Sequence, residues 1–165
     1  MMRYSSPQSA RRHQVRSYIG RHRLSALLAT TALALWASPT LAEDFVIDGV
    51  VNVENGGNVL DGGDSLTVTE TGAISTVGTD AVNGTNGNDV VIDGVISSSG
   101  ANSYGISLVG GVNSVLNNGV INTNGANGRG IQIEGDGDIT NTENGLIATN
   151  DNSATAIMAV SQHMV

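Results

Sequence analysis

The sequence between Asp93 and Ala148 contains one short phrase three times, as Asp93-Gly94-Val95-Ile96-Ser97, Asn118-Gly119-Val120-Ile121-Asn122 and Asn144-Gly145-Leu146-Ile147-Ala148. The copies are 25 and 26 residues apart. The same template occurs upstream, at spacings of 22 and 23 residues, as Thr71-Gly72-Ala73-Ile74-Ser75 and Asp48-Gly49-Val50-Val51-Asn52. In every copy the glycine is followed two residues later by Val or Ile. Repetition with a period of this length is typical of a repeat protein.

Two further columns follow the same period. Eleven and twelve residues after the last three glycines come Gly105-Ile106, Gly130-Ile131 and Ala156-Ile157, followed at period two by Leu108, Ile133 and Ala159. Such alternation predicts a strand with one buried face. Counting back four residues from each glycine gives Phe45, Val68, Val90, Val115 and Asn141. Because the column is otherwise apolar, either Asn141 is a buried Asn or the register of the repeats shifts at this position. Each unit thus carries three strand signals, separated by Gly, Asn, Asp and Ser clusters that favour turns.

These units predict an all-β fold, a right-handed parallel β-helix of about five three-strand turns. Stacked turns would place Val51, Ile74, Ile96, Ile121 and Ile147 in one internal ladder, in a rod roughly 24 Å long at about 4.8 Å per turn. We expect the 22-residue unit to be shortened around Gly78 to Ala81, and Asn118 and Asn144 to stack between turns. The alternative is a small antiparallel sandwich, which repetition in several columns disfavours.

The charged residues divide the chain into two parts. Six of the seven basic residues precede residue 24, whereas residues 43–165 hold one Arg and all fifteen acids, a net charge of −14. An apolar run, residues 24–37, separates the two parts and is followed by Ser38-Pro39-Thr40-Leu41-Ala42. This order predicts a helical signal peptide over residues 1–42, with a long basic region and cleavage after Ala42. A membrane anchor is disfavoured because the run is shorter than about 20 residues and ends at a proline.

Residues 43–165 contain no cysteine, and Phe45 and Tyr104 are their only aromatic residues. The core must therefore be built from Val, Ile, Leu and Ala, without disulfides. The last unit supplies two strand signals and then ends in Ser161-Gln162-His163-Met164-Val165. Because an open β-helix end exposes unpaired backbone groups, we expect residues 43–165 to be an incomplete fragment of a longer rod.

The repeated Asn-Gly-Val-Ile phrases, the Asn/Gly/Thr/Ser/Asp-rich units and the long basic leader resemble the passenger domain of alphaproteobacterial autotransporters. This resemblance covers the leader and the repeats, and implies a β-helical passenger that is exported to the cell surface, where many such domains act as adhesins. The family also carries a C-terminal β-barrel, and no series of roughly ten-residue amphipathic strands ends this sequence. The resemblance therefore implies a truncated passenger, which would reach the periplasm when made alone.

Three stretches of the sequence are candidate sites, and each also has an ordinary structural explanation. Arg129 could stabilise negative charge in a polysaccharide lyase, but its Gly-rich surroundings favour an exposed turn. Glu134, Asp136 and Asp138 alternate, so an extended chain would point three carboxylates to one face and offer a Ca²⁺ site; flanking glycines favour a solvated turn. Residues 84–92 partly resemble a calcium-binding nonapeptide, without the tandem copies that a β-roll needs.

The sequence therefore predicts a non-enzymatic structural or adhesive scaffold, with no catalytic or cofactor-binding residue, no cofactor and Ca²⁺ only as the alternative above. Host surfaces, abiotic surfaces and cell-surface glycans are the expected partners, and the negative charge disfavours nucleic acid. Two other hypotheses stay open: a β-helical polysaccharide lyase or hydrolase, and a Ca²⁺-stabilised secreted structural module.

Overall fold

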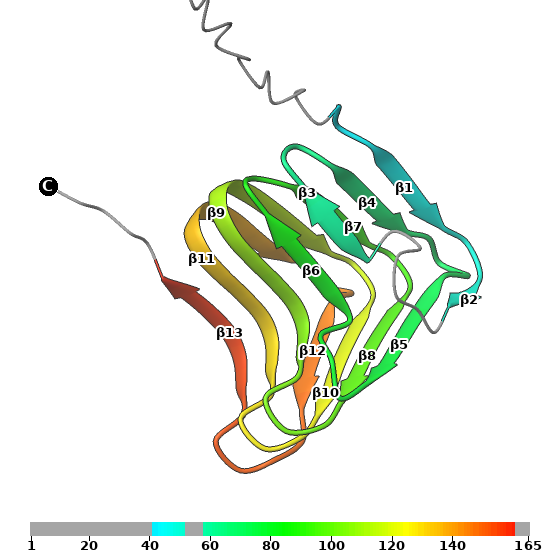
Figure 1. Ribbon diagram of the computed structural model, residues 1–165. Helices are drawn as coiled ribbons and strands as arrows, with labels where there is room; N and C mark the ends of the chain where they lie inside the picture. Colours follow the sequence, from blue (N-terminus) through cyan, green and yellow to red (C-terminus); the bar gives the residue numbers. More distant parts are fainter. Residues whose placement is uncertain (1–40, 52–57, 161–165) are drawn as a thin grey trace, which may run out of the picture. The chain divides into compact units, whose positions relative to one another are not determined.

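The computed structural model describes residues 41–51 and 58–160, which form only strands and turns (Figure 1). Residues 1–40 of the expected signal peptide lie outside the described residues. The strands make two sheets. The eight-stranded sheet contains β1 (Asp44–Ile47), β3 (Val59–Asp61), β4 (Ser65–Val68), β6 (Val82–Thr85), β7 (Asp89–Ile92), β9 (Tyr104–Asn117), β11 (Arg129–Asn141) and β13 (Thr155–Val160). The five-stranded sheet contains β2 (Val50–Val51), β5 (Ala73–Val77), β8 (Val95–Ser99), β10 (Val120–Asn124) and β12 (Leu146–Thr149).

The chain alternates between the two sheets and coils as it advances (Figure 1). Each strand pairs with the equivalent strand of the next turn, so the five-stranded sheet has the order β12-β10-β8-β5-β2. All strand pairs among the described residues are parallel. The fold is therefore a parallel β-solenoid, as predicted, and the antiparallel sandwich is excluded.

The predicted internal ladder is confirmed residue by residue. Val51 pairs with Ile74, Ile74 with Ile96, Ile96 with Ile121, and Ile121 with Ile147. The three central isoleucines are fully buried, whereas Val51 and Ile147, at the two ends of the ladder, are only partly buried. Each turn thus supplies the apolar surface that its neighbours need, and no turn has a complete core by itself.

The second predicted column is also in register. Ile106 pairs with Ile131 and Ile131 with Ile157, and the column begins one turn earlier at Val82. Only eight residues separate Ile74 from Val82, whereas ten separate Ile96 from Ile106. The 22-residue unit is therefore shortened between Gly78 and Ala81, as expected.

The third predicted column was wrong at two positions. Leu66, not Val68, pairs with Val90, and Ile139, not Asn141, pairs with Val115. Val68 and Asn141 belong to the neighbouring inward column, Ile47–Val68–Ile92–Asn117–Asn141. The reason is that the turn leading to the repeat glycine has two lengths. Ile92 lies two residues before its glycine and Val68 lies four before its own.

The separation into three short strands per turn was only partly correct, because β9 and β11 continue through the corner between two strand positions. At this bend Gly110 and Gly111 have φ angles of 71° and 65°, and Gly135 has 135°. L side chains rarely adopt these angles. The pairing of β9 with β11 shifts register here, between Glu134 and Asp136, so glycine lets the strands turn the corner without ending.

The glycine of the repeated phrase serves close packing between turns. A Cβ placed on Gly94 would lie 2.2 Å from the carbonyl oxygens of both Gly72 and Thr69. A Cβ on Gly119 would lie 2.1 Å from the carbonyl oxygen of Gly94. Only a residue without a side chain fits where one backbone rests directly on the next. This contact explains why the glycine recurs with the period of the solenoid.

Amide side chains also stack at the corners. Asn118 donates to the carboxylate of Asp93, one turn earlier, over 2.8 Å, and Asn113 accepts from the backbone N–H of Asn88 over 3.0 Å. Asn118 thus bonds between turns, but its partner is Asp93, whereas Asn144, with which it was expected to stack, is exposed. These bonds satisfy polar groups where strands give way to turns.

Candidate functional site on the outer face of β9 and β11

A chain of polar contacts runs along the outer side of β11. The guanidinium of Arg129 lies over the ring of Tyr104, its register partner on β9, with 5.0 Å between its central carbon and the ring centroid. Arg129 donates to the side-chain oxygen of Gln132, whose amide nitrogen donates to the carboxylate of Glu134. Gln132 is 4% exposed although Ile131 and Ile133 beside it belong to the core. The amide therefore links a planar cation to an acid on one face of the solenoid.

Arg129 was expected in an exposed turn, and that prediction was wrong. It is the first residue of β11 and is partly buried. The Gly-rich stretch around it predicts a turn, but Gly130 is buried because the backbone there packs tightly. A Cβ on Gly130 would lie 2.3 Å from Ile147 and 2.5 Å from the carbonyl oxygen of Ala156. Close packing, not turn geometry, accounts for this glycine.

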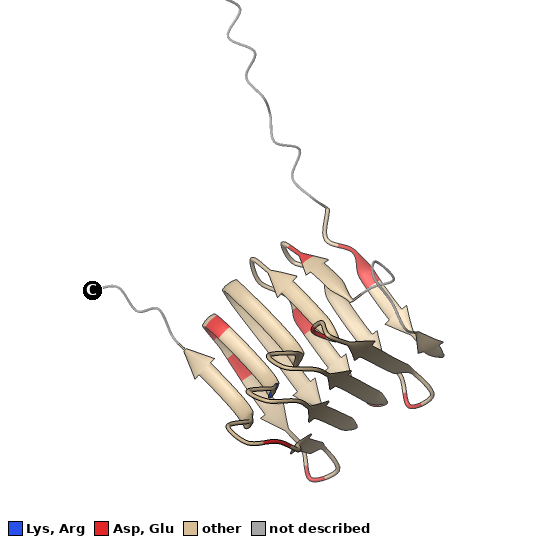
Figure 2. Cartoon of the chain, turned by 60° about the horizontal axis from the view of Figure 1, so that its bottom comes forward, with Lys and Arg blue, Asp and Glu red and all other residues tan. Residues whose placement is uncertain are grey.

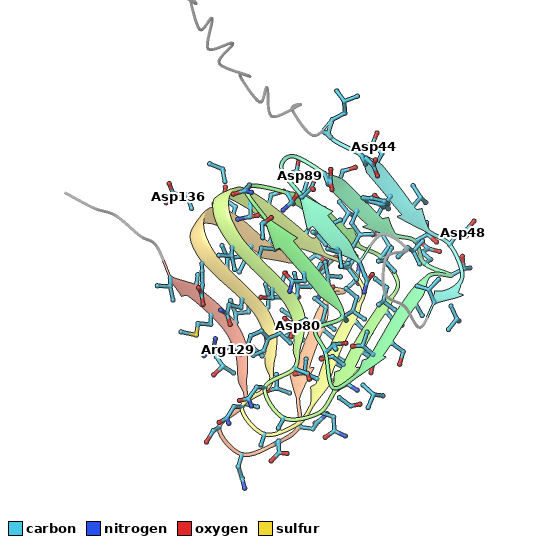
Figure 3. The ribbon with its side chains drawn as sticks, viewed as in Figure 1. Asp44, Asp48, Asp80, Asp89, Arg129 and Asp136 are labelled. Carbon is cyan, nitrogen blue, oxygen red and sulfur yellow. The ribbon has the colours of Figure 1, made fainter. Side chains whose placement is uncertain are left out.

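A shallow hollow of about 500 Å³ opens where β9 and β11 bend. Its lining residues are Val109, Gly110, Gly111, Val112, Glu134, Gly135 and Asp136. The three glycines leave the bend without side chains. Two carboxylates and two exposed valines therefore border a space open to solvent. Figure 3 shows Asp136 at this bend and Arg129 near the other end of β11.

The structure brings together two of the three residues proposed for Ca²⁺. Glu134 and Asp136 line the hollow, whereas Asp138 is not part of its lining. The register shift between Glu134 and Asp136 breaks the regular alternation that would point three carboxylates the same way. Within residues 41–51 and 58–160, no group of three or more His, Asp or Glu side chains is close enough to hold a metal ion.

Asp138 instead belongs to an outer column of Asp and Ser residues that was not predicted from the sequence. In register, this column reads Asp44, Ser65, Asp89, Ser114 and Asp138. Ser65 donates to Asp44 over 2.5 Å, and Ser114 donates to Asp89 over 2.7 Å. Alternation keeps the carboxylates two strand spacings apart, about 10 Å, which is beyond the roughly 8 Å over which salt screens charge. The column therefore carries acids while limiting their repulsion.

Asp80 lies in the shortened turn between β5 and β6. Burial raises the pKa of Asp80 above its ordinary value of 3.8, and a hydrogen bond from the backbone N–H of Tyr104 opposes that change. The N–H lies 2.8 Å from the carboxylate oxygen. The hydrogen bond of Asp80 thus joins the turn to β9, although burial disfavours the ionised form of its carboxylate.

Together these features define the class of protein, a parallel β-solenoid with a largely apolar interior and acids on the outer side of its eight-stranded sheet. The described residues include no helix that is long and apolar enough to cross a membrane. Comparison of the chain with protein-family models, curated proteins and solved structures found no match in any of the three.

Proposed function

We propose that this chain is an exported scaffold that has a structural or adhesive role at a bacterial cell surface, in the manner of an autotransporter passenger domain. The observation that carries the proposal is the contrast between inner and outer columns. The inner ladder holds only Val and Ile at five levels. One outer column of the same sheet is less constant and reads Ser75, Ser97, Asn122 and Ala148.

A constant interior with a varied exterior suits display. Stacked turns make a rigid support, and outer side chains can change without loss of the core. Export is supported by the leader, in which a basic region, an apolar run and small residues before Glu43 follow the order of a secretory signal. The same solenoid is compatible with a passenger domain, and the resemblance in the leader and the repeats adds to that support.

The role that we propose is non-enzymatic. Arg129, the single basic residue after the leader, already contacts Tyr104 and Gln132. A lyase needs a cation directed at the substrate carboxylate. The hollow offers two carboxylates instead, which favours contact with hydroxyl-rich or cationic groups. Cell-surface glycans and host surfaces of that chemistry are the partners that we propose.

Four measurements test the proposal and its alternatives. Expression of the full-length chain in a bacterium, followed by mass spectrometry, should give a product that begins at Glu43; a product that keeps residues 1–42 would contradict export. The exported protein should then be retained on glycan-coated or matrix-coated surfaces. If the protein released unsaturated products from acidic glycans and Arg129→Ala abolished that release, the protein would be an enzyme and the scaffold proposal would be wrong. A melting temperature unchanged by EGTA would dismiss the Ca²⁺-stabilised module.

A further inference from the structure

The outer face of the five-stranded sheet carries an aliphatic column. The residues that precede the inner ladder are in register and point outward, and we call them the outer aliphatic column: Val50, Ala73, Val95, Val120 and Leu146. Val50 is 75% exposed, Val95 41% and Leu146 54%. Single exposed apolar residues are common on protein surfaces, but a continuous row of five is the pattern of an interaction surface.

The strands of this face contain no charged residue. None of β2, β5, β8, β10 and β12 contains an Asp, Glu, Lys or Arg. All the charged residues within strands lie in the eight-stranded sheet, and Figure 2 shows red segments on its strands and in the turns. This distribution matters because residues 43–165 have a net charge of −14. The strands of the five-stranded sheet offer a partner aliphatic and small polar side chains, and the nearest acids before them, Asp48 and Asp93, lie in the turns that precede β2 and β8.

We propose that this face binds a second copy of the same chain. Two copies repel each other through their net charge, and the uncharged sheet is the face where close approach costs least. Sheets that pack face to face lie about 10 Å apart, with their side chains between them. Ser75, Ser97 and Asn122, which flank the column, are short enough to permit that distance.

The order of side chains in the column favours a two-fold arrangement. An axis along β8 would reverse the order of the turns between copies and keep Val95 opposite Val95 of the second copy. Leu146 would then face Val50, and Ala73 would face Val120. The smallest side chain is thereby matched with a larger one, so no alanine meets an alanine across the interface. Such an isologous contact uses one patch twice.

The size of the face sets the strength of the contact. The five strands have two to five residues each and cover at most roughly 24 Å by 16 Å, on the order of 400 Å². Stable dimers bury about 800 Å² on each partner. Two copies should therefore associate weakly and reversibly in dilute solution, and association should strengthen where many copies are held together. This inference is independent of the proposed function, because it requires neither export nor an adhesive ligand.

Site-directed cross-linking tests the proposal, since the chain contains no cysteine. Val95→Cys in the full-length protein, treated with a short bis-maleimide, should give a covalent dimer. Val46→Cys is the matched control, because Val46 is an exposed strand valine of the eight-stranded sheet. We expect cross-linking at position 95 at least about tenfold faster than at position 46. The rate should rise with NaCl, which screens the mutual repulsion.

A second substitution separates docking from random collision. Val120→Asp added to Val95→Cys should abolish the dimer while leaving the circular dichroism spectrum and melting temperature unchanged. Equal rates at positions 95 and 46 would overturn the proposal. A cross-linking rate at position 95 that falls as NaCl is added would also overturn it. A cross-linked product formed only with a different protein would do the same. A mixture of Ala73→Cys and Val120→Cys chains should give mainly the mixed dimer, whereas mainly like dimers would refute the reversed order.

Discussion

Asn117 donates through its side-chain amide to the side-chain oxygen of Asn141, 2.7 Å away and one turn further along the solenoid. Asn117 is fully buried in a column that is apolar in the three preceding turns. This one inner column therefore changes from aliphatic to amide packing at Asn117. A buried amide is stable only while its hydrogen bonds are made.

We expect Asn141→Ala to destabilise the protein by about 1–3 kcal/mol, since it leaves the buried amide of Asn117 without this acceptor. Chemical denaturation of the two proteins measures the difference. Asn124→Ala is the control, because Asn124 is an exposed strand residue and its replacement should change stability by less than about 0.5 kcal/mol. Equal losses for the two variants would contradict the role of the amide pair.

Gly94→Ala should be strongly destabilising. The new methyl group would meet two carbonyl oxygens at 2.2 Å, and backbone atoms cannot move aside as a flexible side chain can. We expect a loss of about 2–3 kcal/mol, within the usual range for overpacking. Gly49→Ala is the matched substitution in the first copy of the phrase, where a Cβ would meet nothing within 4 Å. A small effect at Gly94, or a large one at Gly49, would show that the turns are spaced differently.

The inward position of Ile96 in the inner ladder predicts which of two neighbouring substitutions in β8 destabilises the protein more. Ile96→Ala should cost about 2–5 kcal/mol, because Ile96 is fully buried and its truncation leaves a cavity. Val95→Ala, one residue earlier on the outer face, should cost less than about 0.5 kcal/mol. Thermal and urea unfolding of both variants provide the comparison. A larger loss of stability in Val95→Ala than in Ile96→Ala would mean that Val95, and not Ile96, points into the core.

The raised pKa of Asp80 predicts the sign of a pH effect. Burial disfavours the ionised carboxylate, so the folded state holds the proton more tightly than the unfolded chain. Stability linked to this group is fully present below its ordinary pKa of 3.8 and is lost as pH rises through the folded-state pKa. Asp80→Asn retains an oxygen that can accept from Tyr104 and removes the charge.

Asp80→Asn should therefore raise the melting temperature at pH 7, and the gain should shrink as the pH falls below 3.8. Melting curves of both proteins across that range measure it. Asp89→Asn, on an exposed residue of β7, is the control for loss of one negative charge. A gain of the same size at every pH, or the same profile in the control, would refute the assignment to burial.

The period and the inner ladder could be predicted because they depend on spacing alone. Each phrase glycine is followed two residues later by an inward residue, and Ile74, Ile96 and Ile121 meet as expected. The third column could not be placed from sequence, since adding two residues to a turn preserves the alternation of inward and outward side chains. The apolar pattern therefore reads equally well in the wrong alignment, as it did at Val68.

The candidate site was harder to predict for a related reason. The inward positions of Ile96 and Ile121 imply that Val95 and Val120 point outward, but the sequence alone cannot show whether another segment covers them. The contacts of Arg129 depend on the close packing of Gly130 and on Tyr104, 25 residues earlier. The column of Asp and Ser carried a usable signal, because Ser65 and Ser114 both fall beside an Asp once the turns are aligned.

The backbone hydrogen bonds that join the turns run parallel to the axis of the solenoid. A pull applied between its two ends therefore loads the bonds of one terminal turn at a time, as in peeling, and leaves the interior turns unstressed until their own release. Each released turn of 22 to 26 residues would extend by about 80 Å. Under tension the molecule should thus lengthen in a series of small steps and absorb work at each one, a useful property for a tether.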